Sequence, residues 1–156
     1  MGSGKTTVGE LLARDLGWPF IDLDAVIEAN RAATVREIFE TFGEAFFRGL
    51  EHAALTEAVK AEPAVVALGG GTFAQPANLD FIRQRGGATV WLDCPLDVLR
   101  DRCAHMDNRP LFRDPFSFAQ LLEQRLPYYR QAEFRVSTHA QEPEEVVKQI
   151  LRLPIF

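Results

Sequence analysis

Six residues near the start of the chain have the composition of a phosphate-binding loop. They are Gly2, Ser3, Gly4, Lys5, Thr6 and Thr7, and apolar residues at helical spacing follow them. Glycines let backbone N–H groups turn toward phosphate oxygens, and the N-terminus of a helix adds its positive end. A lysine here reaches the β- and γ-phosphates of a nucleotide, and the next threonine hydroxyl ligates Mg²⁺. The pattern predicts a nucleotide site in which Lys5 is catalytic and Thr6 contacts the metal.

A pair of carboxylates follows in the sequence Phe20-Ile21-Asp22-Leu23-Asp24. Side chains two residues apart share one face of a strand, so a strand here would present Asp22 and Asp24 together. Two carboxylates at a strand end can hold a metal-bound water and a substrate hydroxyl. Solvated turn residues and a helix N-cap are the alternatives, and the nearness of the phosphate loop favours a functional pair.

Two further groups have the spacing of a binding site. Arg48 and Glu51 are three residues apart on a predicted helix, so they share a face and Glu51 can steady an arginine that binds a carboxylate. An exposed ion pair that contributes little is the alternative. Three glycines at 69–71 follow an apolar run and allow a ring to approach the backbone closely. A flexible turn is the alternative there.

The elements that would position these residues alternate between helix and strand. Periodicity predicts helices over 5–16, 34–42, 44–61, 76–84, 95–104, 117–129 and 142–151, and strands over 20–24, 64–68, 88–92 and 134–137. Apolar strands between helices indicate a parallel sheet flanked by helices, which is an α/β fold. Ligands in such folds bind at the carboxyl ends of the strands, where the candidate residues lie.

Length, charge and composition narrow the function classes. The 156 residues predict one domain over 1–156, and a net charge of -5 argues against generic nucleic-acid binding. Cys94 and Cys103 have neither disulfide-framework nor metal-ligand spacing, which is typical of reduced cytosolic cysteines. No apolar run reaches membrane-spanning length. We expect a cytoplasmic protein that contacts neither membrane nor nucleic acid.

The ordered motifs resemble those of shikimate kinase, a member of the nucleoside-monophosphate-kinase-like P-loop group. The resemblance covers nearly the whole chain. It rests on Gly-Ser-Gly-Lys-Thr-Thr, Phe-Ile-Asp-Leu-Asp, Ile-Phe-Glu-Thr-Phe-Gly-Glu-Ala-Phe-Phe-Arg-Gly-Leu-Glu, the glycine triplet, Asn-Arg-Pro-Leu at 108–111 and Arg-Leu-Pro-Tyr-Tyr at 125–129. It implies a three-layer fold and transfer of the ATP γ-phosphate to the 3-hydroxyl of shikimate, a step of the aromatic amino-acid pathway.

The resemblance also implies roles for individual residues at the acceptor. Asp24 would bind the shikimate hydroxyls and help to orient the one that is attacked. Arg48 and Arg125 would hold the shikimate carboxylate, and Gly70 and Gly71 would contact the ring through their backbone. The helical region that binds shikimate would span about residues 24–61.

On the nucleotide side the resemblance implies ATP as co-substrate and Mg²⁺ as cofactor. Asp22 would reach the metal through water. A lid over about residues 105–116 would bring Arg109 onto the transferred phosphoryl group. Arg102 would stack on the adenine ring, with Pro110 on its other face. A monomer that binds only shikimate and ATP is expected, and Arg130 is expected at the surface.

The full Walker A pattern has a first glycine that would lie two positions before Met1. Relatives of this kind have a buried central strand that leads into the loop. We therefore expect that the printed chain lacks its first, central strand, and that in this form it folds poorly and has little activity. Two other functions stay open: a different small-molecule P-loop kinase, such as a gluconate kinase, and an inactive nucleotide-binding fragment.

Overall fold

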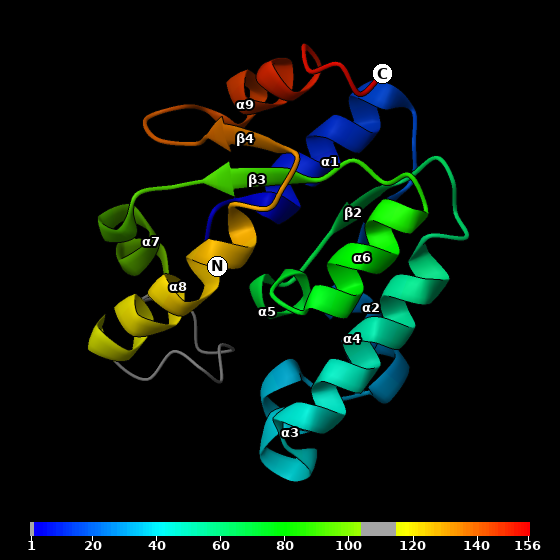
Figure 1. Ribbon diagram of the computed structural model, residues 1–156, viewed down its shortest axis with the longest axis vertical. Coiled ribbons are helices and arrows are strands. Elements are labelled where there is room, and N and C mark those ends of the chain that lie inside the picture. Colours follow the sequence, from blue (N-terminus) through cyan, green and yellow to red (C-terminus); the bar gives the residue numbers. More distant parts are fainter. Residues whose placement is uncertain (1, 104–114) are drawn as a thin grey trace.

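The computed structural model describes residues 2–103 and 115–156, in which helices and short strands alternate as expected (Figure 1). The helices are α1 (Lys5–Leu16), α2 (Leu23–Arg31), α3 (Val35–Phe42), α4 (Glu44–Ala58), α5 (Gly70–Phe73), α6 (Pro76–Gln84), α7 (Leu96–Cys103), α8 (Pro115–Tyr129) and α9 (Pro143–Ile150). The strands are β1 (Phe20–Asp22), β2 (Val65–Ala67), β3 (Val90–Asp93) and β4 (Phe134–Ser137). The expected lid, with Arg109 and Pro110, lies almost entirely outside the described residues.

The strands pair in parallel, which confirms the expected strand direction. In the described part of the chain, β1 pairs with β2 and β3 pairs with β4, as two separate two-stranded sheets. In the first sheet Phe20 lies opposite Val65, and in the second Val90 lies opposite Phe134. β2 and β3 are the strands that face each other across the space between the sheets.

Helices cover the strands on both faces, which makes three layers. Successive side chains of β2 point to opposite faces, because side chains alternate along a strand. Val65 packs with a core shared by α1, β4 and α9, and Val66 packs with a core shared by α2, α4 and α6. Figure 1 shows α1 beside β3, and α4 and α6 beside β2. This three-layer α/β arrangement is the one that the sequence predicts.

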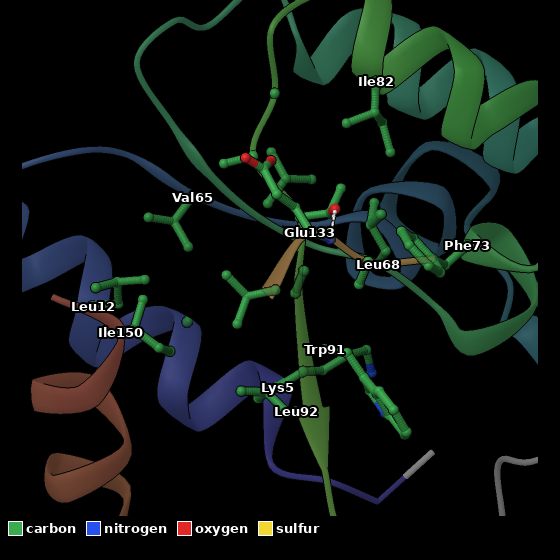
Figure 2. A pocket seen from close by; sticks show the side chains of 18 of the residues that line it. Lys5, Leu12, Val65, Leu68, Phe73, Ile82, Trp91, Leu92, Glu133 and Ile150 are labelled. Carbon is green, nitrogen blue, oxygen red and sulfur yellow. Dashed lines mark hydrogen bonds between the residues drawn. The ribbon is translucent and has the colours of Figure 1, made fainter. Parts of the chain in front are cut away.

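A large apolar cavity separates the two sheets. Its volume is about 880 Å³. Figure 2 shows Leu12 and Ile150 on one side of it and Leu68 and Phe73 on another, with Leu92 of β3 also in the lining. The cavity therefore lies between β2 and β3.

Helices α2, α3 and α4 form a lobe with its own core, which contains Ile27, Ile38 and Phe47. Thr34 begins α3 with a reciprocal cap, since its hydroxyl accepts from the Glu37 N–H while the Glu37 carboxylate accepts from the Thr34 N–H. α4 runs from this lobe back toward the strands (Figure 1).

Several predicted boundaries are wrong. β1 ends at Asp22 and Asp24 lies in the first turn of α2, so the two carboxylates do not share a strand face. The reason is that the Asp22 side chain accepts from the N–H groups of Asp24 and Ala25, which starts a helix there. The helix predicted over 44–61 ends at Ala58, and the glycine triplet is not a simple turn but leads into the short helix α5.

No helix in residues 2–103 or 115–156 has the length and apolar character needed to cross a membrane. Arg130 is exposed, as expected.

Candidate active site

The phosphate loop is built as its sequence predicts, up to the first turn of α1. Gly4 caps the helix with a φ of 86°, a left-handed conformation that favours glycine, and Lys5 is the first helical residue. The Thr6 hydroxyl donates to a carboxylate oxygen of Asp22 over 2.8 Å. The Arg102 guanidinium donates to the Gly2 carbonyl over 3.2 Å. The loop is thus tied to the end of β1 and to α7.

Asp22 has two tasks at once. One carboxylate oxygen accepts from Thr6, and the other accepts from the backbone of α2. The N-cap that the sequence analysis kept as an alternative is therefore correct for Asp22. It does not exclude a second role, because the Thr6 and Asp22 oxygens lie side by side, and oxygen ligands of this kind suit a hard cation that keeps part of its water. The described residues contain no group of three or more histidine, cysteine or acidic side chains placed to hold a metal ion together.

Arg48 lies in a partly buried ion-pair cluster and not in an exposed pair. Its guanidinium donates to Glu51 over 2.6 Å and to Glu44 over 2.9 Å. The Arg48 side chain keeps 15% of its accessible surface and Glu51 keeps 2%. The pair predicted from the i, i+3 spacing is therefore present, and the surface alternative is wrong.

Burial and the ion pair both shift the pKa values of Arg48 and Glu51. Burial disfavours the charge of Arg48, but the contacts with Glu51 and Glu44 outweigh it and raise the arginine pKa. Burial raises the pKa of the Glu51 carboxyl, although hydrogen bonds from Thr72 and Arg48 act in the opposite direction. The charge on Glu51 is therefore costly to keep unless Arg48 remains beside it.

The glycine segment (residues 69–71) is the point on which the candidate acceptor residues converge. A Cβ on Gly71 would lie 2.6 Å from Cζ of Arg48, so the guanidinium would have to move. A Cβ on Gly70 would collide with the Tyr129 hydroxyl and lie 3.2 Å from the Arg125 guanidinium. A side chain at either position would therefore displace the end of a neighbouring one, Tyr129 at Gly70 and Arg48 at Gly71.

The third position of the segment meets the acidic residues. A Cβ on Gly69 would lie 3.3 Å from the Asp24 carboxylate and 3.2 Å from the Glu51 carboxylate. Arg125, which comes from α8, is buried. The fold thus brings Asp24, Arg48 and Arg125 from three different helices to one short stretch of backbone.

This arrangement was only partly visible in the sequence. Glu44 stands four residues before Arg48, so helical spacing carries a signal for that contact. The packing of Tyr129 against Gly70 and the hydrogen bond from Thr72 to Glu51 join residues distant in sequence, and no local pattern indicates them. Lys5 lines the apolar cavity together with Trp91 and Leu92 (Figure 2). Arg109 and Pro110 lie outside the described residues.

Comparisons with known proteins agree with these features. The family model described as shikimate kinase matches residues 1–153. A shikimate kinase of Moorella thermoacetica is 42% identical over 96% of this chain and 87% of that protein. A crystal structure of shikimate kinase from Aquifex aeolicus has a TM-score of 0.86 at 40% identity, and covers 97% of this chain and 89% of that one.

Two further solved structures are similar to this chain. A shikimate kinase from Acinetobacter baumannii in complex with shikimate has a TM-score of 0.92 at 37% identity, over 97% of this chain and 86% of that one. A gluconokinase from Sinorhizobium meliloti has a TM-score of 0.63 at 24% identity, over 97% of this chain and 85% of that one, which shows a shared fold only. Because the family model matches almost the whole of this chain, the chain belongs to the shikimate kinase family.

Proposed function

We propose that this chain transfers the γ-phosphoryl group of ATP to the 3-hydroxyl of shikimate. The observation that carries the proposal is the convergence of Arg48, Arg125 and Asp24 on the glycine segment. Two arginines beside a backbone without side chains suit a carboxylate on a flat ring, and a carboxylate beside them suits the ring hydroxyls. The relative from Acinetobacter baumannii, which was solved with shikimate, supports the same acceptor.

In the acceptor site each group has one task. Arg48 and Arg125 hold the substrate carboxylate, and the backbone of Gly70 and Gly71 lies against the ring. Asp24 accepts hydrogen bonds from the ring hydroxyls and orients the one that attacks phosphorus. Residues 24–61, which include α2, α3 and α4, form the acceptor-binding region of a single domain over 1–156.

In the nucleotide site the backbone from Gly2 to Thr7 binds the phosphates, and Lys5 neutralises the β- and γ-phosphates. Thr6 and Asp22, the latter through water, are the residues that would hold Mg²⁺. The metal, when bound, supplies positive charge to the phosphate oxygens. Arg102 lies beside the loop at Gly2, which supports a contact with the nucleotide.

Phosphoryl transfer depends on positioning and on charge neutralisation more than on covalent chemistry. Lys5 and Arg109 would stabilise the charge that spreads over the transferred group. A lid over about residues 105–116, with Arg109 and Pro110, would exclude water that otherwise hydrolyses ATP. A monomer in the cytoplasm, without nucleic-acid or membrane partners, stays a prediction.

A coupled assay of ADP release with shikimate or gluconate as acceptor tests the proposed function. We expect ADP release that depends on shikimate, a product phosphorylated on the ring, and no turnover above background with gluconate. Lys5→Met should lower kcat at least about 100-fold, because it removes a charge at the transferred phosphate. Turnover with gluconate but not with shikimate would assign the chain to a different acceptor.

A further inference from the structure

A line of buried polar side chains runs behind the glycine segment, from α6 to α4. Asn78 donates its amide Nδ2 to the Thr72 carbonyl over 2.9 Å, and the Thr72 hydroxyl donates to Oε1 of Glu51 over 2.5 Å. Asn78, Thr72 and Glu51 expose only 2%, 0% and 1% of their surface. Buried polar groups are costly unless they are hydrogen-bonded, and here each of these links satisfies a group on both of its partners.

One end of the line is fixed by His52 on α4. Its Nδ1 lies 2.7 Å from Oδ1 of Asn78. The Thr72 carbonyl can only accept, so the Asn78 amide must turn its Nδ2 toward Thr72 and its Oδ1 toward His52. Nδ1 of His52 therefore carries a hydrogen. Both ends of the Asn78 amide are held, and with them the Thr72 backbone.

The other end of the line reaches the acceptor site. The two oxygens of Glu51 are divided, because Oε1 accepts from Thr72 and Oε2 accepts from Arg48. Without the Thr72 hydroxyl the carboxylate is free to rotate about its last bond and to carry the guanidinium with it. That guanidinium lies against Gly71, where a displacement of one ångström changes the room left for a ring.

We propose that Thr72 and Asn78 are positioning residues that hold Arg48, through Glu51, at the distance from Gly71 that a substrate carboxylate requires. This inference rests on the proposed function. A valine at 72 would fill the same volume, so close packing does not require a hydroxyl there. Neither side chain is placed at the attacked hydroxyl. Loss of either should therefore weaken acceptor binding and leave the chemical step and ATP binding unchanged.

Steady-state kinetics of Thr72→Val and Thr72→Ser test the proposal. Thr72→Val removes the donor to a charged group, so we expect the KM for shikimate to rise about ten-fold while kcat and the KM for ATP stay within about two-fold. Thr72→Ser keeps the hydroxyl and should restore the KM to within about two-fold of the parent value. Asn78→Leu acts one link further away and should raise the same KM about three-fold.

Thr89→Val is the matched control. Thr89 is also buried, and its hydroxyl oxygen accepts from the Glu133 N–H, a contact between the residues that directly precede β3 and β4 and outside the acceptor site. It should lower the melting temperature without changing the KM for shikimate. A purely structural role for Thr72 predicts the same behaviour for Thr72→Val. Equal KM values for Thr72→Val and the parent would overturn the proposal, and so would an equal rise in KM for Thr89→Val.

Calorimetric titration of the parent chain with shikimate separates the two levels of inference. If a parent chain that melts cooperatively, and is therefore folded, neither binds nor phosphorylates shikimate, the proposed function is wrong and the positioning role falls with it. If the parent binds and phosphorylates shikimate and Thr72→Val binds it equally well, only the positioning role is wrong. A variant that binds shikimate more weakly, and that serine at 72 rescues, supports both.

Discussion

The glycine segment and the apolar cavity both adjoin β2, yet they are built in opposite ways. Around the glycine segment, side chains from α2, α4 and α8 approach the backbone so closely that a Cβ on Gly70 or Gly71 would displace the side chain beside it. On the inner edge of β2, apolar side chains surround a cavity of about 880 Å³. Side-chain contacts thus complete the first region, whereas the second has the open strand edges and apolar walls that a further strand requires.

A strand supplied upstream should change the cavity region most. We expect that about ten added residues, an apolar strand with a glycine two positions before Met1, would raise the melting temperature by at least about 10 °C. The strand would pair with β2 and β3 and bury the walls of the cavity. Circular dichroism melts of the extended and the printed chain measure the effect, with a glycine-serine extension of equal length as the control. Equal melting of all three would refute the expectation.

The corresponding disruption of the filled region is Arg48→Ala. It leaves the buried Glu51 carboxylate without its cation, so we expect a loss of about 3 kcal/mol in the free energy of unfolding at pH 7. Lys60→Ala is the matched control, because Lys60 and Glu57 have the same i, i+3 spacing and a 2.7 Å contact but keep 66% and 69% of their side-chain surface. An exposed pair of this kind should contribute less than about 0.5 kcal/mol.

Urea unfolding of both variants measures the two losses. Similar losses would show that burial adds nothing to the Arg48 pair. That result would remove the contrast between the tightly filled region around the glycine segment and an ordinary exposed ion pair. The KM for shikimate should rise only for Arg48→Ala.

The pH dependence of the Arg48→Ala loss tests its cause. Burial already raises the Glu51 pKa above 4.5, and removal of Arg48 deletes two of the contributions that lower it, so the folded-state pKa rises further. A raised folded-state pKa contributes stability that is complete below the unfolded pKa and is lost as the pH rises through the folded pKa. The loss in Arg48→Ala should therefore be largest at neutral pH and shrink by about half or more near pH 4.5.

Unfolding at several pH values between 4.5 and 8 would show this trend. In Arg48→Ala combined with Glu51→Gln the trend should disappear, because the second substitution removes the titrating group. A loss that is independent of pH in the single variant would mean that packing, and not the unpaired carboxylate, is responsible.

The contrast between the two regions also explains what the sequence was able to predict. Arg48 with Glu51 and Gly4 with Lys5 are local patterns on single helices, and both were predicted with their correct geometry. The α/β class followed from apolar runs that alternate with helical periodicity. Asp24 was placed on the wrong element, because Phe-Ile-Asp-Leu-Asp fits a strand by alternation and only the N-cap hydrogen bonds of Asp22 turn it into a helix.

The contacts that no pattern indicated are those made across the fold. Tyr129 of α8 contacts Gly70, and Thr72 of α5 donates to Glu51. The residues in each pair are far apart in sequence, and no helical or strand periodicity links them. The same limit applies to α5, since three glycines favour an irregular turn and only packing against α4, α6 and α8 makes a short helix there. The prediction therefore named residues that the fold brings to the glycine segment, but not the contacts that fix their distances.

The smallest expected effect compares two glycines close to the acceptor site. Gly71→Ala places a methyl group against the Arg48 guanidinium, so we expect the KM for shikimate to rise about ten-fold, as for the loss of one charged hydrogen bond. Gly49→Ala lies in the exposed interior of α4, where a Cβ meets nothing within 4 Å. It should leave the KM unchanged and stabilise the helix by about 0.5–1 kcal/mol.

Kinetics and thermal melts of the two alanine variants distinguish a close approach from a merely flexible turn. If the glycine triplet were only a flexible turn, Gly71→Ala would leave the KM for shikimate near the parent value. A rise confined to Gly71→Ala would show that the absence of a side chain at 71, and not glycine content in general, is what admits both the arginine and the ring. Selectivity for the acceptor would then depend on the missing methyl group at residue 71, whereas stability around the cavity beside β2 would depend on the pairing of strand backbones.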